Sequence, residues 1–321
     1  MPRPLLLSGL RVFEAVTRTG SFRAAAADLG LTPSAVSHAM RGLEGALGAN
    51  LCRREGGEIR LTPQGATLMY YVERGFGELQ LGIGSIMGPG PQTLRLHSAP
   101  SFAATWLVPR LRRMLAEVGG LEVRIAASTE YTRFVADEFD ADIVYGAPTP
   151  DQYGTAGHQG VVILPLGTET ATPLCTPERA DAITSARSLF AQTLIESDNK
   201  IVRWPAWFAA NGLVAPEPNG PRFDRSFLSL SAAADDLGVA LESTRLAERE
   251  LATGRLVAPL AGIAADVVYT GHWLVCPRAK RYSRPIVLFL AWLARELGID
   301  IGDTMRPKAA SGHEHVLSST E

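Results

Sequence analysis

Near the N-terminus, apolar and polar positions alternate with the period of an α-helix. From residue 32 onward, the apolar residues recur at steps of four, three and four, so we expect them to share one face and pack on a core: Val36, Met40, Leu43 and Leu47. Thr32 suits the N-cap position of this helix, and Pro33 suits its first turn. The pattern therefore predicts a helix that begins at residue 33 and exposes a polar opposite face.

Two shorter helical stretches precede this helix. Residues 21–29 are rich in alanine, with Ser21 as a suitable N-cap, and Gly30 permits the left-handed conformation that ends a helix. An earlier apolar stripe predicts another helix over about 7–19. Two helices joined by a tight turn with glycine are typical of the helix-turn-helix unit, whose second helix enters the major groove of DNA.

A small β-hairpin is predicted after the third helix. Residues 55–62 contain a Gly-Gly turn and a short alternating run, which would form a wing beside Arg53 and Arg54. The alternative is an alanine-rich helical bundle with solvated arginines, and a single short motif would favour that alternative. Three helices, a turn glycine and a hairpin in this order favour the DNA-binding interpretation.

The expected DNA contacts come from the polar face of the third helix and from flanking arginines. Base edges would be read by four residues: Ser34, Ser37, His38 and Arg41. Phosphates would be contacted by three arginines: Arg23, Arg53 and Arg54. Thr32 and Pro33, at the start of the helix, complete the expected DNA-binding set.

These segments resemble the LysR-type transcriptional regulators. The resemblance is carried by Ser21-Phe22, Ala35-Val36-Ser37, Leu43-Glu44, Leu47-Gly48, Arg54 and Leu61-Thr62-Pro63 with Gly65. Three later stretches, 101–111, 203–212 and 246–257, resemble the glycine-cleavage and β-lactamase regulator branch of that family. The resemblance implies a sequence-specific DNA-binding regulator, not an enzyme, whose activity a small-molecule effector controls. It implies no cofactor.

Two positions depart from the pattern of the resembled family. Cys52 stands where the family usually has Phe, which would loosen the packing beneath the wing. Asp235 and Asp236 stand where the family often has a small residue. Two adjacent carboxylates there would either reshape the rim of an effector pocket or form a solvated turn.

A long helix is predicted from Pro63 to about Met87. Its apolar residues recur at near-heptad spacing, which indicates a partner helix: Leu68, Val72, Phe76, Leu79, Ile83 and Ile86. The alternative is an amphipathic helix that lies on its own domain. The resembled family pairs subunits through this helix, so we expect a homodimer or a homotetramer.

Strand-like and helical stretches alternate beyond the Gly-Pro break at 88–91. Strands are predicted at 94–98, 121–127 and 142–146, with helices at 102–116 and 132–139, and the rhythm repeats over 167–269 before a last helix at 285–297. This alternation is typical of βαβ units and a largely parallel sheet. The resemblance implies two α/β subdomains arranged as in periplasmic binding proteins.

The expected fold is therefore a multidomain α/β protein with a winged helix-turn-helix at its N-terminus. We expect a DNA-binding domain at 1–62, a linker helix and hinge at 63–91, an effector domain at 92–303 and a disordered tail at 304–321. Within the effector domain, subdomain I would comprise about 92–166 and 270–303, and subdomain II about 167–269.

The effector is expected beyond the carboxyl ends of the strands, where open α/β sheets bind ligands. Ser98 and Ser101 stand at a helix start that favours a carboxylate, although Ser101 could merely cap that helix. The full expected set follows from position at element ends and from the resemblance: Ser98, Ser101, Phe102, Thr129, Glu130, Ser197, Trp204, Phe227 and Tyr269. His272 ranks below them.

Composition narrows the remaining classes of protein. The first sixty residues carry eight arginines against five carboxylates, although the whole chain of 321 residues has a net charge of −2. The three cysteines are far apart in sequence, so no disulfide framework or zinc site is indicated, and no catalytic signature occurs. The pair His313-x-His315 would be a solvated part of the tail.

The expected location is the cytoplasm, because no signal peptide precedes the first helix and the longest apolar run, 286–293, is too short to span a membrane. The expected partners are double-stranded DNA, a small-molecule effector, further copies of the chain and RNA polymerase, with no membrane. The alternatives are an exported solute-binding protein and an enzyme on an α/β scaffold.

Overall fold

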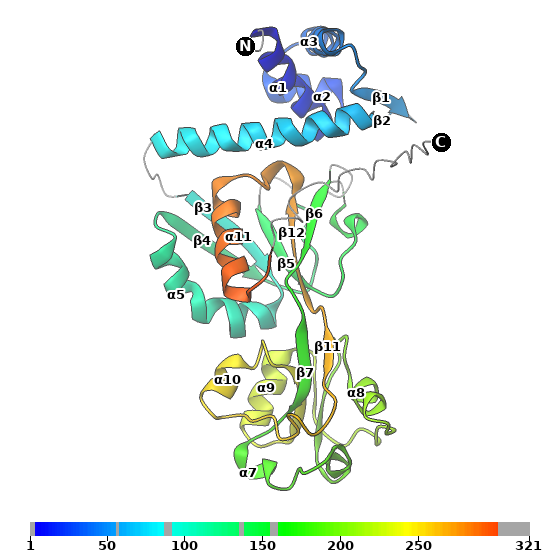
Figure 1. Ribbon diagram of the computed structural model, residues 1–321, viewed down its shortest axis with the longest axis vertical. Coiled ribbons are helices and arrows are strands. Elements are labelled where there is room, and N and C mark those ends of the chain that lie inside the picture. Colours follow the sequence, from blue (N-terminus) through cyan, green and yellow to red (C-terminus); the bar gives the residue numbers. More distant parts are fainter. Residues whose placement is uncertain (1–3, 56–57, 87–91, 135–137, 155–159, 301–321) are drawn as a thin grey trace, which may run out of the picture. The chain divides into compact units, whose positions relative to one another are not determined.

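The computed structural model describes residues 4–55, 58–86, 92–134, 138–154 and 160–300 (Figure 1). The chain forms two compact units, residues 1–79 with 293–321 and residues 80–292. The predicted disordered tail and the pair His313-x-His315 lie outside the described residues. Within the described residues, no helix is long and apolar enough to cross a membrane. The same residues contain no group of three or more His, Cys, Asp or Glu side chains suited to a metal ion.

The N-terminal unit contains the helices and the hairpin that the sequence predicts. They are α1 (Pro4–Thr19), α2 (Phe22–Leu29), α3 (Pro33–Leu47), β1 (Cys52–Glu55), β2 (Glu58–Leu61) and α4 (Pro63–Ile86). Ser21 and Thr32 cap α2 and α3 by accepting the backbone N–H groups of Ala24 and Ala35. Gly30 ends α2 in the left-handed conformation with φ of 65°. Local backbone chemistry therefore accounts for the turn between the two helices.

The core of this unit lies between α1, α3 and the first half of α4. Val36, Met40 and Leu43 are buried on α3 as the pattern predicts, but Leu47 is 44% exposed, so that part of the prediction is wrong. The reason is local, because Gly48 ends the helix directly after Leu47 with φ of 66°. Cys52 packs partly buried against the same core, and burial, together with the charge of Glu44, raises the pKa of its thiol to about 11.

The apolar stripe of α4 serves more than one surface. Val72 is buried in the core of the N-terminal unit, and Leu68 and Phe76 pack partly buried against it. This part of the helix follows the alternative of a helix that lies on its own domain. Leu79 is 58% exposed, and the side chains of Ile83 and Ile86 lie outside those described. A partner helix therefore remains a prediction for the later part of α4.

The wing is tied to α3 and to α4 through Leu51. The carboxylate of Glu44 accepts the N–H of Leu51 at 2.7 Å, and the carbonyl of Leu51 accepts the N–H of Thr62 at 2.9 Å. A Cβ added to Gly65 would lie only 2.0 Å from that same carbonyl oxygen. Glycine at this motif position therefore allows α4 to begin directly beneath the wing.

Residues 80–292 form two five-stranded sheets with helices on them. The first has the order β4-β3-β5-β12-β6 and comprises β3 (Gln92–Ser98), β4 (Leu121–Ala127), β5 (Ala141–Tyr145), β6 (Val161–Pro165) and β12 (His272–Pro277). The second has the order β11-β7-β10-β8-β9 and comprises β7 (Glu169–Leu174), β8 (Leu194–Ser197), β9 (Arg222–Phe223), β10 (Val239–Ser243) and β11 (Val267–Tyr269). The chain passes between the sheets twice, from β6 to β7 and from β11 to β12 (Figure 1).

These two crossings make both sheets mixed. In the first sheet β3 runs parallel to β4 and β5, whereas β12 is antiparallel to β5 and β6. In the second sheet β8 runs parallel to β9 and β10, whereas β7 is antiparallel to β10 and β11. The prediction of a largely parallel sheet therefore needs one correction. The strand that enters each sheet through a crossing, β12 or β7, is antiparallel to both of its neighbours, whereas the other four strands of each sheet share one direction.

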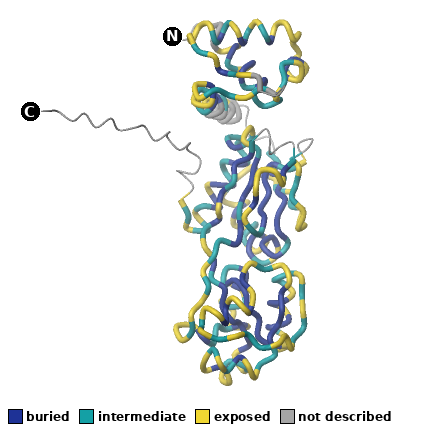
Figure 2. The backbone as a smooth tube through the Cα atoms, turned by 90° about the vertical axis from the view of Figure 1, so that its right-hand side faces the viewer, coloured by how far each residue is buried: buried dark blue, intermediate teal, exposed yellow. Residues whose placement is uncertain are grey.

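Helices cover the faces of both sheets, and their buried positions concentrate with the strands in the interior (Figure 2). They are a π-helical turn η1 (Phe102–Leu107), α5 (Val108–Glu117), α7 (Pro177–Ala180), α8 (Trp204–Ala210), α9 (Ser226–Ala234), α10 (Glu248–Ala252) and α11 (Arg284–Leu297). The described residues also form the short 3₁₀ turns η3 (Pro150–Tyr153), η4 (Ala186–Ala191) and η5 (Arg278–Lys280). Trp106 of η1 and Trp292 of α11 meet with ring centroids 6.0 Å apart, which packs these helices together on the first sheet.

The helix predicted at 132–139 is absent from the described part of that segment. Phe134 has φ of 50°, a left-handed conformation that does not continue an α-helix. The N–H of Thr132 donates instead to the buried carboxylate of Asp142 at 3.3 Å. A tertiary contact to β5 therefore overrides the local helical pattern, and residues 135–137 lie outside the described residues.

Candidate functional site

The polar face of α3 is open to solvent. Thr32, Pro33, Ser34, His38 and Arg41 are exposed, and Ser37 is half-buried. The Arg41 guanidinium lies along the helix, where its Nε donates to the carbonyl of Ser37 at 3.3 Å. This face is opposite the buried residues of α3, so it presents hydroxyls, an imidazole and a guanidinium without apolar bulk.

Residues on neighbouring elements extend this polar face. Arg23 on α2 and Arg53 on β1 are exposed, whereas the side chain of Arg54 lies outside those described. A shallow groove is lined by Ser8 of α1 together with residues of α3 and its cap, among them Ser34 and His38. The sequence pattern did not single out Ser8, because it belongs to a helix that was assigned only to packing.

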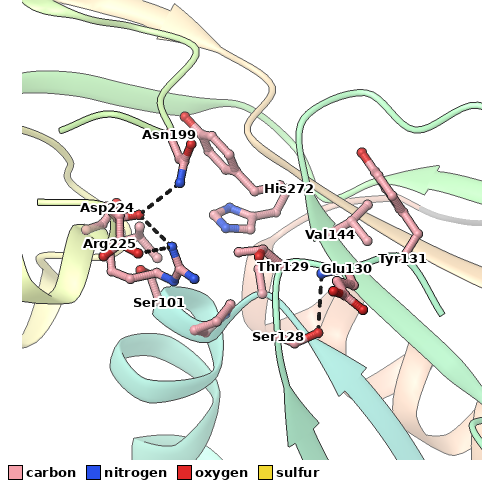
Figure 3. Close-up of a pocket in the computed structure, with 15 residues that line it drawn as sticks. Ser101, Ser128, Thr129, Glu130, Tyr131, Val144, Asn199, Asp224, Arg225 and His272 are labelled. Carbon is pink, nitrogen blue, oxygen red and sulfur yellow. Dashed lines mark hydrogen bonds and ion pairs between the residues drawn. The ribbon is translucent and has the colours of Figure 1, made fainter. Parts of the chain in front are cut away.

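A second candidate site is a cavity of about 290 Å³ in residues 80–292 (Figure 3). Both sheets contribute to its walls through loops at strand ends. The side of the first sheet supplies Ala99, Pro100, Ser101, Ser128, Thr129, Glu130, Tyr131, Val144, Tyr145 and His272. The side of the second sheet supplies Asn199, Asp224, Arg225, Ser226 and Leu246. Such a concave, partly apolar site with convergent polar groups suits a small molecule.

Three of the residues expected at an effector site line this cavity, namely Ser101, Thr129 and Glu130. Ser101 has helical backbone angles, and its side chain makes no capping bond to η1, so the alternative that it merely caps the helix is wrong. Its Oγ instead accepts the backbone N–H of Phe227 at 3.4 Å. The Ser101 hydroxyl proton therefore remains available to a ligand.

The other six expected residues do not line the cavity. Phe102 is fully buried and stacks on Trp106 with centroids 4.9 Å apart, and Trp204 donates its Nε1–H to the carbonyl of Ile195 at 2.9 Å. The remaining four residues that are absent from the lining are Ser98, Ser197, Phe227 and Tyr269. Position at an element end does not determine which way a side chain points, and large aromatic residues gain more from burial in a core.

A chain of hydrogen bonds fixes the loop that carries Thr129 and Glu130. His97 Nδ1 lies 2.7 Å from a carboxylate oxygen of Asp142, and its Nε2 lies 2.9 Å from the Ser128 Oγ. The Ser128 Oγ also accepts the N–H of Glu130 at 3.3 Å. Both His97 and Asp142 are buried, so this chain holds the loop against the first sheet.

His272 lies at the middle of the cavity wall in Figure 3, although the sequence ranked it low. Its Nδ1 lies 2.6 Å from Glu169, which also accepts the Ser243 hydroxyl at 2.6 Å and lies 3.4 Å from Arg245. Burial favours a higher pKa for Glu169, but the charges and hydrogen bonds of these three partners outweigh it and lower the pKa to about 2. Glu169 is therefore an ionised carboxylate behind the cavity.

Arg225 is a second cavity residue that the sequence pattern missed. Its Nη1 donates to the carboxylate of Asp224 at 2.7 Å and to the carbonyl of the same residue at 3.0 Å. The available signal was its place in the polar run Asp224-Arg225-Ser226, directly before α9. The neighbouring carboxylates at 235 and 236 lie elsewhere, because Asp236 pairs with Arg179 at 2.8 Å and neither residue lines the cavity. The pocket-rim alternative for them is therefore wrong.

A buried ion pair lies behind the wall of the second sheet. The ammonium of Lys200 contacts the carboxylate of Glu242, which is fully buried, and donates to the carbonyl of Leu241 at 2.8 Å. Burial raises the pKa of Glu242 and lowers the pKa of Lys200, and the opposite charge works against both shifts. Lys200 directly follows Asn199, so this pair supports a residue of the cavity.

Two family models match the chain. Residues 7–66 match the model described as "Bacterial regulatory helix-turn-helix protein, lysR family", and residues 88–298 match "LysR substrate binding domain". HTH-type transcriptional regulator PerR of Escherichia coli is 45% identical over 293 residues, which are 91% of this chain and 96% of that protein. HTH-type transcriptional activator AmpR of Rhodobacter capsulatus is 31% identical over 295 residues, which are 91% and 98% of the two chains.

Solved structures agree with these matches. The effector domain of the transcriptional regulator AmpR of Pseudomonas aeruginosa superposes with a TM-score of 0.53 at 27% identity, over 64% of this chain and 96% of that domain. CrgA, a LysR-type regulator from Neisseria meningitidis, has a TM-score of 0.50 at 22% identity, over 91% and 98% of the two chains, which shows the fold alone. Together with the mixed sheets, the matches confirm the predicted fold class.

Proposed function

Because the chain belongs to the LysR family of transcriptional regulators, we propose that α3 reads the base edges of an operator and that a small molecule in the cavity controls the response. The observation that supports DNA reading most directly is the polar, exposed face of α3 directly after a capped helix-turn-helix. The comparisons give no support to a solute-binding protein or an enzyme.

We assign the DNA contacts as the sequence suggests. Ser34, Ser37, His38 and Arg41 would contact bases, and Thr32, Pro33, Arg23, Arg53 and Arg54 would contact or position the backbone. For the domains, we retain a winged helix-turn-helix at 1–62, a linker at 63–91 and an effector domain at 92–303. The protein would contact RNA polymerase at the promoter, in the cytoplasm.

Replacing Arg41 by alanine is expected to weaken operator binding by about 1–3 kcal/mol, because a guanidinium that bonds a guanine edge contributes about this much discrimination. The full chain would first select its fragment from genomic DNA, and fluorescence anisotropy would then give the dissociation constants for that fragment and for a scrambled one. The matched control is Arg23→Ala, which is expected to weaken both by the same factor. Equal losses for Arg41→Ala on both fragments would assign Arg41 to the phosphates instead.

We propose that two copies pair through the later part of α4. Leu79 is 58% exposed there, and Tyr71 on the same helix is 62% exposed. Two recognition helices from one dimer would reach two half-sites about 34 Å apart. Homotetramers would then be pairs of these dimers.

A carboxylate at position 79 is expected to raise the dimer dissociation constant by at least about tenfold, since an unpaired charge in an apolar interface is strongly unfavourable. Sedimentation velocity on Leu79→Asp would measure this, with Leu47→Asp as a control at another exposed leucine. An unchanged dissociation constant for Leu79→Asp would remove this helix from the interface.

We propose that the protein binds its effector without converting it. Ser128, His97 and Asp142 are hydrogen-bonded in the order of a serine hydrolase triad, with 2.9 Å from Ser128 Oγ to His97 Nε2 and 2.7 Å from His97 Nδ1 to Asp142. The Ser128 hydroxyl also accepts the N–H of Glu130, which supports a role in positioning the loop. Conversion of a bound compound by the purified full chain, with loss of that conversion in Ser128→Ala, would contradict this assignment.

A further inference from the structure

The charged side chains that line the cavity lie in two separate places. Arg225 and Ser101 lie together on one side of the view in Figure 3, and Thr129 and Glu130 lie on the other, with His272 between them. The cavity therefore offers a ligand two chemically different ends. Which groups bind there follows from the bonds that each side chain already makes.

His272 contributes a ring nitrogen that lacks a partner. The side chain is only 1% exposed, and its Nδ1 lies 2.6 Å from the carboxylate of Glu169. Its Nε2 makes no hydrogen bond to any residue that the structure describes. A polar atom on a cavity wall without a partner is normally satisfied by water or by a ligand. This nitrogen is therefore available to a polar group of the ligand.

Glu130 adds a charge to the same end. Its carboxylate is exposed to the cavity and has no hydrogen bond or ion pair within the described part of the chain, whereas the second lining carboxylate, Asp224, is already paired with Arg225. Among the described residues, Glu130 is therefore the lining carboxylate that has no cation beside it. It favours a ligand that brings a positive charge.

The opposite end supplies donors. Only Nη1 of Arg225 is bonded to Asp224, so Nε and Nη2 have no acceptor among the residues described. The Ser101 hydroxyl accepts the N–H of Phe227, which leaves its proton to donate. A guanidinium edge beside a hydroxyl is suited to a carboxylate, which can accept both.

We propose that the effector is a small zwitterion, namely an amino acid. Its carboxylate binds Arg225 and Ser101, its ammonium binds Glu130, and its apolar part contacts Val144 and Leu246. The cavity of about 290 Å³ restricts it to small molecules. This inference rests on the proposed function, because it names the chemistry of the effector site.

The test uses calorimetric titration of the full chain with the twenty common L-amino acids. At least one is expected to bind, and its N-acetyl and carboxamide derivatives, which each lack one charge, are expected to bind at least about tenfold more weakly. Glu130→Gln and Arg225→Gln are each expected to weaken the binding of the free amino acid by a similar factor. Arg249→Gln and Glu178→Gln replace exposed residues outside the cavity lining and should leave binding unchanged.

A cavity-filling variant, Leu246→Trp, separates this inference from the proposed function. If no amino acid binds, or if binding is indifferent to Glu130→Gln, the zwitterion is excluded. If dicarboxylates, aromatic acids or sugars bind instead and Leu246→Trp prevents it, the effector cavity stands and only the zwitterion fails. If a compound that changes operator binding has the same affinity for Leu246→Trp and for the natural chain, the cavity is not the effector site.

Discussion

Replacing Glu169 by alanine is expected to lower the free energy of unfolding of residues 80–292 by about 3–5 kcal/mol, the usual consequence of breaking a buried ionic network. Glu169 is 2% exposed and holds His272, Ser243 and Arg245 around one carboxylate. Its removal leaves the cation of Arg245, whose side chain is 12% exposed, without this partner. Glu169 begins β7 and His272 begins β12. The substitution therefore also removes a hydrogen bond between a strand of the second sheet and a strand of the first.

Urea denaturation followed by tryptophan fluorescence would measure this loss, because all five tryptophans lie within residues 80–292. Glu178→Ala, at an exposed glutamate, is the matched control and should change stability little. A loss below about 1 kcal/mol for Glu169→Ala would show that water replaces the carboxylate without penalty.

The same carboxylate makes stability depend on pH. Its pKa is lowered from 4.5 to about 2 in the folded protein, so its contribution is present above pH 4.5 and is lost as the pH falls toward 2. A shift of this size corresponds to about 3 kcal/mol. The acid limb of the stability curve is therefore expected to be flatter in Glu169→Gln than in the natural chain, and parallel curves would contradict the assignment.

Replacing Lys200 by methionine is expected to lower the free energy of unfolding by about 3–5 kcal/mol, because Glu242 is left as a buried charge without its cation. The double variant Lys200→Met with Glu242→Leu removes both charges and is expected to regain most of that loss. Urea titration of the two single variants and the double variant gives the coupling directly. A double variant no more stable than Lys200→Met would show that packing around the methylene chain, and not the charge, governs this position.

Local signals predicted the DNA-reading half well, because its fold depends on residues close in sequence. Ser21 and Thr32 cap their helices and Gly30 forms the turn, as their residue types indicate. Leu47 shows the limit of periodicity, since a helix that ends at the next residue leaves its last apolar side chain exposed.

The effector half depends on contacts between distant residues, which the pattern does not contain. The bond between His272 and Glu169 joins residues 103 positions apart. In the segment 132–139, where a helix was expected, the N–H of Thr132 donates to Asp142 of β5. Ser101 and Thr129 were predicted because strand ends are local features. Trp204 was assigned to the wrong environment because the direction of a side chain depends on the packing around it.

The packing of α4 sets a minimum length for an operator-reading module that could be transferred to another protein. Met69, Val72 and Phe76 complete the core beneath α1 and α3, so a fragment that ends at residue 62 would expose the apolar surface of this core to water. A chimera that grafts this reader onto a foreign sensor therefore has to carry the chain past Phe76, with its splice point near the exposed Leu79.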